Sequence, residues 1–190
     1  MELKDFIRVY DCDLKIEVIA NLIKYLNDKQ NFVDAGVIGS KGKKNVVNKE
    51  IRKTKSNEFD LTSYSGIHWK NFLYDYVLRH FQYYKQSFPT ASVDIVSTID
   101  PLLYEEGGFY KMHTDHHGRI PRTLSVIIFL NNDYEGGQLN FHFPSEDNKI
   151  FLEVKPKPGR LVMWPSNFLY PHSVSPVTKG KRYTIVSWMV

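Results

Sequence analysis

Hydrophobic and polar positions divide the chain into a helical first part and a strand-rich second part. Across Leu14–Leu26 apolar residues recur every three or four positions and polar residues take the other side, which predicts an amphipathic helix. A broader apolar face of the same period covers Ser63–Lys85 and predicts a second helix. This helix should end at Phe88-Pro89, because proline cannot continue a helix.

The segment between these helices is polar and basic. Glycines gather near the start of residues 35–58, which predicts a mobile loop leading into a short strand at Val46–Thr54. Within Lys41–Lys55, seven Lys or Arg residues accompany a single Glu, and such charge runs are usually solvated loops. His68 and His80 lie on or beside the second helix, and we interpret both as packing histidines.

After Pro89 the pattern changes to short runs rich in Val, Ile, Thr, Phe and Tyr, separated by turn residues. This predicts an antiparallel sandwich or barrel. We expect a mainly β fold with a jelly-roll core and the N-terminal helices packed outside, in a single domain over residues 1–190. Residues 1–89 would supply the helical support and the basic loop, and residues 90–190 the β-core. The expected strands are Ser92–Ile99, Gly108–Thr114, Arg122–Leu130, Gly137–Phe143, Lys149–Val154, Arg160–Trp164, Ser173–Val177 and Arg182–Met189.

Composition narrows the setting of the protein. A chain of 190 residues is long enough for one sizeable core. Its formal net charge of +4 favours anionic partners without singling out nucleic acid. Cys12 is the single cysteine, so no internal disulfide can form, and no apolar run could span a bilayer. We therefore expect a cytoplasmic protein with no membrane partner.

Candidate metal ligands begin with the pair His113-x-Asp115. Residues two apart in a strand point to the same face, so an imidazole nitrogen and a carboxylate oxygen could bind one ion. A second, distant His would complete a 2-His-1-carboxylate triad, which suits non-haem Fe(II). His116 and His117 follow too closely to fold back onto the same ion. His142 and His172 remain the two candidates.

The strand that begins at Arg182 favours His172. Arg182, Thr184, Val186 and Trp188 share one face of it, and a guanidinium pointing into a barrel is costly unless it meets a carboxylate. An arginine fork binds a carboxylate through two parallel hydrogen bonds. This strand therefore predicts a buried anion site beside the metal site.

Four ordered motifs resemble the prolyl 4-hydroxylase branch of the Fe(II)- and 2-oxoglutarate-dependent oxygenases. The resemblance covers Thr90–Val190 and implies a double-stranded β-helix. It also implies that His113, Asp115 and His172 hold Fe(II). The motifs are Tyr104-x-x-Gly107-x-x-Tyr110-x-x-His113-x-Asp115, then Asp133-Tyr134-Glu135-Gly136-Gly137-Gln138-Leu139, then Pro171-His172-Ser173-Val174, and last Gly180-Lys181-Arg182-Tyr183.

The resemblance also implies a cosubstrate site. Arg182 would pair with the distal carboxylate of 2-oxoglutarate, and the residues that match the surroundings of this site are Tyr104, Tyr110, Thr184 and Trp188. Tyr104 and Trp188 are equally explained as aromatic packing residues. Some relatives place a hydroxyl residue on the strand Arg122–Leu130 to assist the arginine, where this chain has Phe129. Anchoring would then rest on Arg182 with Thr184 or Ser125.

The implied activity is a dioxygenase that uses Fe(II), 2-oxoglutarate and O2, with ascorbate as a candidate reductant, and hydroxylates an unactivated C–H bond. A prolyl residue in a peptide or protein is the first choice of substrate, over which the basic loop Lys41–Lys55 could fold. A free amino acid or small metabolite is the alternative. Nucleic-acid repair oxygenases carry a further Arg six residues past the cosubstrate Arg, and here that position is Trp188. An alternative of another class is a non-catalytic jelly-roll binding module.

Overall fold

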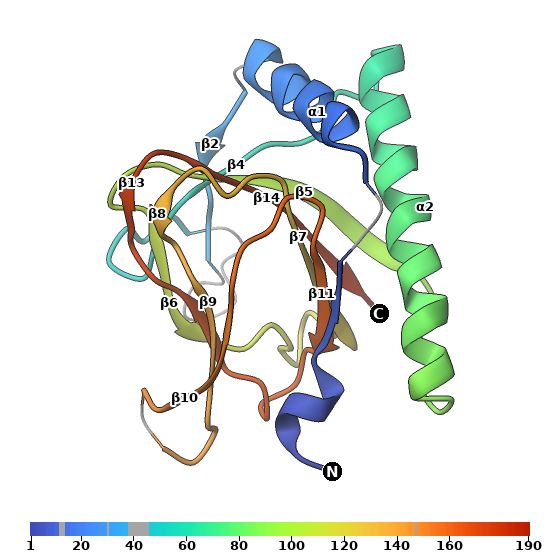
Figure 1. Cartoon of the computed structure of the whole chain (residues 1–190), viewed down its shortest axis with the longest axis vertical. Helices are drawn as coiled ribbons and strands as arrows, with labels where there is room; N and C mark the ends of the chain where they lie inside the picture. The colour runs from blue at the N-terminus through green and yellow to red at the C-terminus, as the bar shows by residue number, and fades with distance from the viewer. Residues whose placement is uncertain (12–13, 30, 38–45, 147) are drawn as a thin grey trace.

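Two facing β-sheets form the centre of the protein, and two helices pack on the outside of the larger sheet (Figure 1). The computed structural model describes residues 1–11, 14–29, 31–37, 46–146 and 148–190. A short 3-10 helix, η1 (Leu3–Phe6), precedes the first strand, and the helices are α1 (Ile16–Lys29) and α2 (Tyr64–Ser87). This is the mainly β fold with flanking helices that the sequence predicts.

The larger sheet has seven strands in the order β1-β11-β7-β14-β5-β4-β2. Its central strand β14 pairs antiparallel with both β5 and β7, and this register places Arg182 opposite Tyr104 and Trp188 opposite Ser125. Residues directly opposite each other project to the same face, so these side chains all point toward the smaller sheet. The strands are β1 (Arg8–Tyr10), β2 (Val33–Asp34), β4 (Lys55–Ser56), β5 (Val96–Tyr104), β7 (Leu124–Phe129), β11 (Leu161–Pro165) and β14 (Arg182–Met189).

The smaller sheet has five strands in the order β10-β9-β12-β6-β3. Strand β12 lies between β6 and β9, and its first residue, His172, pairs with His113 on one side and Phe141 on the other. A separate ribbon joins β8 (Glu135–Gly136) to β13 (Val177–Lys179). The strands of the smaller sheet are β3 (Arg52–Lys53), β6 (Phe109–His113), β9 (Leu139–His142), β10 (Ile150–Val154) and β12 (His172–Val174).

Apolar side chains form two cores, one on each face of the larger sheet. The outer core joins this sheet to the helices and includes Leu26, Leu73 and Ile185, all at most 1% exposed. The inner core lies between the sheets and includes Phe129 and Phe141, both fully buried. A strand buried on both faces is hydrophobic almost throughout, and Leu124–Phe129 is buried at every position and apolar at all but Ser125.

The helices form where the sequence predicts them because their apolar positions recur at helical spacing. Ile19, Leu22 and Leu26 are the buried residues of α1. The Ser63 side chain caps α2 by accepting a hydrogen bond from the Gly66 N–H, which satisfies one of the free donors at the helix start. His80 is buried on α2, where its Nδ1 contacts the Tyr76 carbonyl oxygen at 2.8 Å.

Several elements differ from the sequence prediction. The strand expected at Ser92–Ile99 starts later and runs on to Tyr104, although it contains Pro101. Proline has no N–H to donate, but the Pro101 carbonyl oxygen accepts a hydrogen bond from the Asn57 N–H at 3.0 Å, just after β4. Of the strand expected at Val46–Thr54, only Arg52–Lys53 forms a strand, β3; β4 follows at Lys55–Ser56, and the two strands pair with different sheets.

The basic loop predicted at Lys41–Lys55 lies partly outside the described residues, which resume at Val46. In its described part, Lys49 and Lys55 form surface ion pairs with Asp34 and Glu105. Among the helices of the described residues, none is both long and apolar enough to cross a membrane.

Candidate metal centre and cosubstrate site

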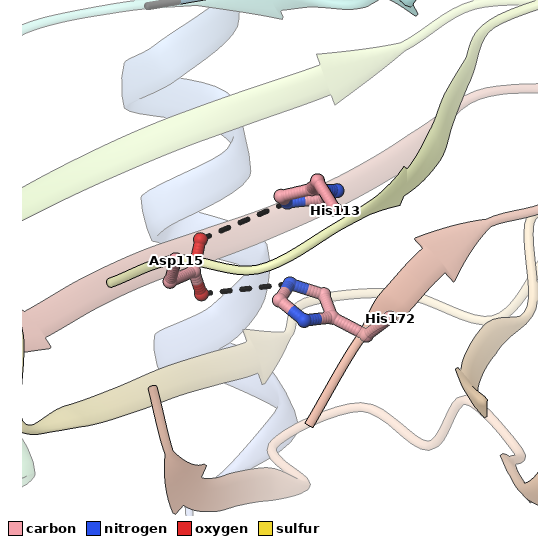
Figure 2. Close-up of side chains that lie close together, drawn as sticks. All are labelled: His113, Asp115 and His172. Atoms are coloured by element: carbon pink, nitrogen blue, oxygen red, sulfur yellow. Dashed lines mark ion pairs between the residues drawn. The ribbon is translucent and has the colours of Figure 1, made fainter. Parts of the chain in front are cut away.

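Three side chains converge between the sheets: His113 at the end of β6, Asp115 two residues further on, and His172 at the start of β12 (Figure 2). The Nε2 atoms of His113 and His172 lie 3.7 and 3.5 Å from the two carboxylate oxygens of Asp115. All three candidate ligand atoms lie within 4.8 Å of one another. This spacing suits ligands that surround one ion at bond lengths near 2 Å.

Backbone contacts fix which nitrogen of each ring faces the carboxylate. The Nδ1 atoms of His113 and His172 lie 2.9 Å from the Lys111 carbonyl oxygen and 3.1 Å from the Tyr170 carbonyl oxygen. A carbonyl accepts, so Nδ1 of each neutral ring carries the proton and Nε2 presents a lone pair to Asp115. The two Nε2 lone pairs and the negative carboxylate oxygens repel one another unless a cation lies between them. The donor set therefore fits a divalent metal ion.

Asp115 is 7% exposed and is held by a chain of hydroxyl groups. The Ser125 hydroxyl donates to Asp115 Oδ2 at 2.7 Å, and Ser166 Oγ lies 2.7 Å from Ser125 Oγ. Burial alone would raise the pKa of Asp115, but the hydrogen bond from Ser125 and the charge of Arg122 favour the ionised carboxylate and lower this pKa. Arg122 adds a positive charge, with Nη1 3.6 Å from Oδ1. Asp115 is therefore ionised and oriented, as a metal ligand must be.

The remaining histidines take no part in this cluster. Among the described residues, His113, Asp115 and His172 form the one group of three or more candidate ligands close enough to hold an ion. His142 was the alternative third ligand, but it follows Phe141, the residue paired with His172, and so projects from the other face of β9. Its Nε2 contacts the Ser173 hydroxyl at 2.8 Å. His116 and His117 are exposed on the loop after Asp115.

A β-bulge brings Tyr110 to the same face as His113. The register between β12 and β6 shifts, so that His172 pairs with His113 while Val174 pairs with Tyr110. As a result the Tyr110 and His113 rings stack with centroids 3.6 Å apart. Burial raises the pKa of Tyr110 to about 12, which keeps its hydroxyl protonated. Tyr110 therefore forms a wall of the metal centre.

Arg182 is fully buried inside the barrel, and its charge meets no carboxylate among the described residues. Its guanidinium lies 4.7 Å from the Tyr104 ring centroid and 5.3 Å from that of Phe129. Nη1 donates to Thr184 Oγ1 at 3.4 Å, whereas Nε and Nη2 have no hydrogen-bond partner in the described part of the chain. A buried cation with unused donors fits an anionic ligand, and the fork geometry fits a carboxylate.

The other predicted cosubstrate residues divide between the two ends of the barrel. Tyr104 and Thr184 lie at Arg182. Trp188 lies at the other end, where the Arg122 guanidinium stacks 3.5 Å from its ring centroid. Ser125, considered as a partner of Arg182, instead bonds Asp115, because β7 pairs it opposite Trp188 rather than opposite Arg182.

Two features of the site were not predicted from sequence. The Tyr134 hydroxyl is buried next to Arg182, and only its place in the motif Asp133–Leu139 hinted at a role. Asp100 on β5 carries a carboxyl whose pKa burial, reinforced by Glu58, raises to about 6. Asp100 occupies the strand position opposite Val186, on the barrel side of the sheet.

Comparison with known proteins agrees with this geometry. Residues 100–190, which contain all three metal-site residues and Arg182, match the family model described as the 2OG-Fe(II) oxygenase superfamily. This part of the chain is therefore similar to the 2OG-Fe(II) oxygenase superfamily. The description of this family names 2-oxoglutarate and Fe(II), which are two of the cofactors that the sequence predicts.

Curated relatives match only parts of this chain. A segment of 68 residues is 40% identical to human prolyl 3-hydroxylase 2, covering 35% of this chain and 9% of that protein. A segment of 107 residues is 36% identical to a PKHD-type hydroxylase of Synechococcus sp. (strain CC9605), covering 52% of this chain and 45% of that protein. The chain therefore spans less than half the length of either relative.

Solved structures share the fold over almost the whole chain. A prolyl hydroxylase from Trichoplax adhaerens, in complex with a peptide fragment of hypoxia inducible factor, superposes with a TM-score of 0.75 at 20% identity, covering 97% of this chain and 83% of that one. A Pseudomonas putida prolyl-4-hydroxylase superposes with a TM-score of 0.74 at 20% identity, covering 97% and 92%. The chain therefore shares the fold of these two prolyl hydroxylases.

Proposed function

We propose that this protein is an Fe(II)- and 2-oxoglutarate-dependent dioxygenase that hydroxylates a prolyl residue in a peptide or protein. One observation carries the proposal. The same barrel holds a 2-His-1-carboxylate cluster whose Nε2 lone pairs face a carboxylate, and a fully buried Arg182 with unused donors. The first arrangement needs a divalent cation and the second needs an anion, and a metal with a dicarboxylic cosubstrate meets both needs.

Each residue of the site has a distinct task. His113, Asp115 and His172 would hold the ion and leave coordination positions open for the cosubstrate and oxygen. Bound Fe(II) and 2-oxoglutarate supply the oxidising chemistry: O2 and 2-oxoglutarate are consumed, succinate and carbon dioxide are released, and one oxygen atom enters a C–H bond.

The rest of the barrel prepares the ligands and keeps the site dry. Ser125 orients Asp115, and Arg182 orients the cosubstrate through its distal carboxylate. Phe141 and Trp164, which pack edge to face with centroids 5.1 Å apart, stand beside His172 and exclude water from it. Ascorbate, which keeps iron in the ferrous state, and a cytoplasmic location complete the proposal.

Support for a prolyl substrate comes from the activities named for the similar proteins. The human relative is a prolyl 3-hydroxylase, and the Pseudomonas putida structure is a prolyl-4-hydroxylase. The site is lined by aromatic rings such as Tyr110 and Trp188, which suit an apolar pyrrolidine ring. Arg52 lies 4.7 Å from the Tyr110 ring centroid and extends the positive charge of the basic loop toward the metal centre, which favours a peptide with acidic flanks.

The decisive experiment measures succinate formation together with product mass. Purified protein with Fe(II), ascorbate and 2-oxoglutarate is incubated with proline-containing peptides that have acidic or basic flanks. We expect succinate and a one-oxygen gain on proline with acidic-flanked peptides, and neither with His172→Ala. Nuclear magnetic resonance of the product then distinguishes 3- from 4-hydroxyproline.

The alternatives give different results in the same experiment. Oxygen gain on a free amino acid but on no peptide would replace the prolyl peptide with a small-molecule substrate. Absence of succinate with every peptide and with a cell lysate would contradict the dioxygenase proposal and favour a binding module.

A further inference from the structure

Tyr134 lies directly against the buried guanidinium of Arg182. A Cβ atom added to Gly137 would meet Arg182 Cδ at 3.0 Å and Tyr134 Cε2 at 3.1 Å, so the two side chains approach each other over this glycine. A Cβ on Gly180 would lie 3.4 Å from Tyr134 Cα and Cβ. Both glycines have positive φ, +65° and +81°, which residues with a side chain rarely adopt. Two glycines therefore make room for the Tyr134 ring beside Arg182.

The Tyr134 hydroxyl is buried beside the Arg182 guanidinium, which can only donate, so its own proton meets no acceptor among the described residues. Burial raises the pKa of this hydroxyl, and the nearby Arg182 charge opposes the rise. The hydroxyl therefore remains protonated at neutral pH and keeps a proton to donate. A buried donor left unpaired is costly, and native proteins rarely retain one unless a ligand or water completes it.

The donors around Arg182 suit a carboxylate better than Arg182 alone would. A carboxylate has two oxygens with about four acceptor sites, and a guanidinium fork occupies only two of them. The other wall residues at the guanidinium, Tyr104 and Phe129, present ring faces to it. Thr184 Oγ1 already accepts a hydrogen bond from Arg182. The Tyr134 hydroxyl is thus a free donor placed where a carboxylate bound to Arg182 needs one.

We propose that Tyr134 is a cosubstrate-binding residue whose hydroxyl donates a hydrogen bond to the distal carboxylate held by Arg182. It would make the site selective for 2-oxo dicarboxylic acids over 2-oxo monocarboxylic acids. This inference rests on the proposed function, because it takes 2-oxoglutarate to be the anion. The role concerns binding and orientation, so it does not require Tyr134 to contact the metal.

Binding of two 2-oxo acids to Tyr134→Phe tests this role without turnover. Protein loaded with Mn(II) is titrated by calorimetry in the absence of oxygen, once with 2-oxoglutarate and once with 2-oxopentanoate, which carries a methyl group in place of the distal carboxylate. A hydrogen bond to a charged group predicts that Tyr134→Phe weakens 2-oxoglutarate binding about 10- to 100-fold. Binding of 2-oxopentanoate should change by less than about twofold, because this acid has no distal carboxylate to accept a hydrogen bond from Tyr134.

Tyr183→Phe is the matched control. Tyr183 adjoins Arg182 but projects to the helix side of the sheet, where its hydroxyl donates to Asn27 Oδ1 at 2.7 Å. This variant should lose thermal stability and keep wild-type affinity for both 2-oxo acids. Tyr134→Phe should melt close to the wild type without ligand, since the Tyr134 hydroxyl donates its proton to no acceptor among the described residues.

The outcomes separate this inference from the proposed function. Unchanged 2-oxoglutarate affinity in Tyr134→Phe, or equal weakening for both acids, would overturn the role of Tyr134 while the wild-type titration still supports the oxygenase. Failure of the wild type to bind 2-oxoglutarate in the presence of Mn(II) would overturn both. Selective weakening for 2-oxoglutarate alone supports both.

Discussion

Replacing Ser125 by Ala tests whether the hydroxyl chain behind Asp115 prepares this residue for metal binding. The Ser125 side chain is 1% exposed and has one proton, which it donates to Asp115 Oδ2 at 2.7 Å. The proton between Ser125 Oγ and Ser166 Oγ must therefore come from Ser166. Ser125→Ala removes the donor from an ionised, buried carboxylate and leaves the Ser166 hydroxyl without its acceptor.

The expected loss follows from these contacts. A hydrogen bond to a charged group contributes about 1.5–3 kcal/mol, and the orphaned Ser166 hydroxyl adds to the cost. For metal binding, loss of a residue that orients a ligand typically weakens affinity about 10- to 100-fold. Calorimetric titration of Mn(II) into the variant measures the second effect, and urea unfolding without metal measures the first.

Ser187→Ala separates orientation of Asp115 from loss of a buried hydrogen bond in general. Ser187 is also 1% exposed and bonds the Thr98 carbonyl oxygen at 2.7 Å, but it lies on the opposite face of β14 from Trp188. It should cost stability and leave Mn(II) affinity unchanged. The reasoning fails if Ser125→Ala binds Mn(II) as tightly as the wild type, or if both variants lose the same affinity.

Two further predictions concern the charged groups of the barrel. Arg182→Ala should raise the 2-oxoglutarate requirement about 10- to 100-fold while Mn(II) affinity stays within about twofold, as measured by KM and by calorimetry; a lost metal site would contradict this separation. Burial raises the pKa of Asp100 in the folded protein to about 6, from an ordinary value of 3.8. Between these two pH values the folded state keeps a proton that the unfolded chain releases, so the free energy of unfolding falls as the pH rises from about 4 to about 6. Asp100→Asn should therefore be more stable than the wild type at pH 7, by on the order of 2 kcal/mol, and the difference should vanish near pH 4. Urea unfolding at several pH values measures this difference, and a difference that does not change with pH would exclude this cause.

The sequence predicts the elements whose signals are local. Helices α1 and α2 follow from apolar residues at helical spacing, and Ser63 and Pro89 mark where α2 starts and ends. The core strands follow from hydrophobic runs between turn residues. Within the site, His113, Asp115, His172 and Arg182 were named from motif spacing, and the structure brings the first three together.

The rest depends on pairing between distant segments, which local patterns do not encode. Tyr110 joins His113 through a bulge in the pairing with β12. Ser125 reaches Asp115 rather than Arg182 because of its register with β14. Strand β3 is two residues long, and its place in the smaller sheet depends on pairing with β6 rather than on a pattern in its own sequence. Tyr134 belongs to a motif noted for its glycines, and its position against Arg182 depends on both Gly137 and Gly180.

The central claim is that His113, Asp115 and His172 hold one divalent metal ion. Calorimetric titration of Mn(II) into the wild type and Asp115→Ala tests it most directly, with Asp100→Asn as a control that removes another carboxyl of the barrel side. We predict one ion per chain in the wild type and in Asp100→Asn, and no binding in Asp115→Ala. Equal binding by Asp115→Ala and the wild type, or no binding by the wild type, would contradict the assignment.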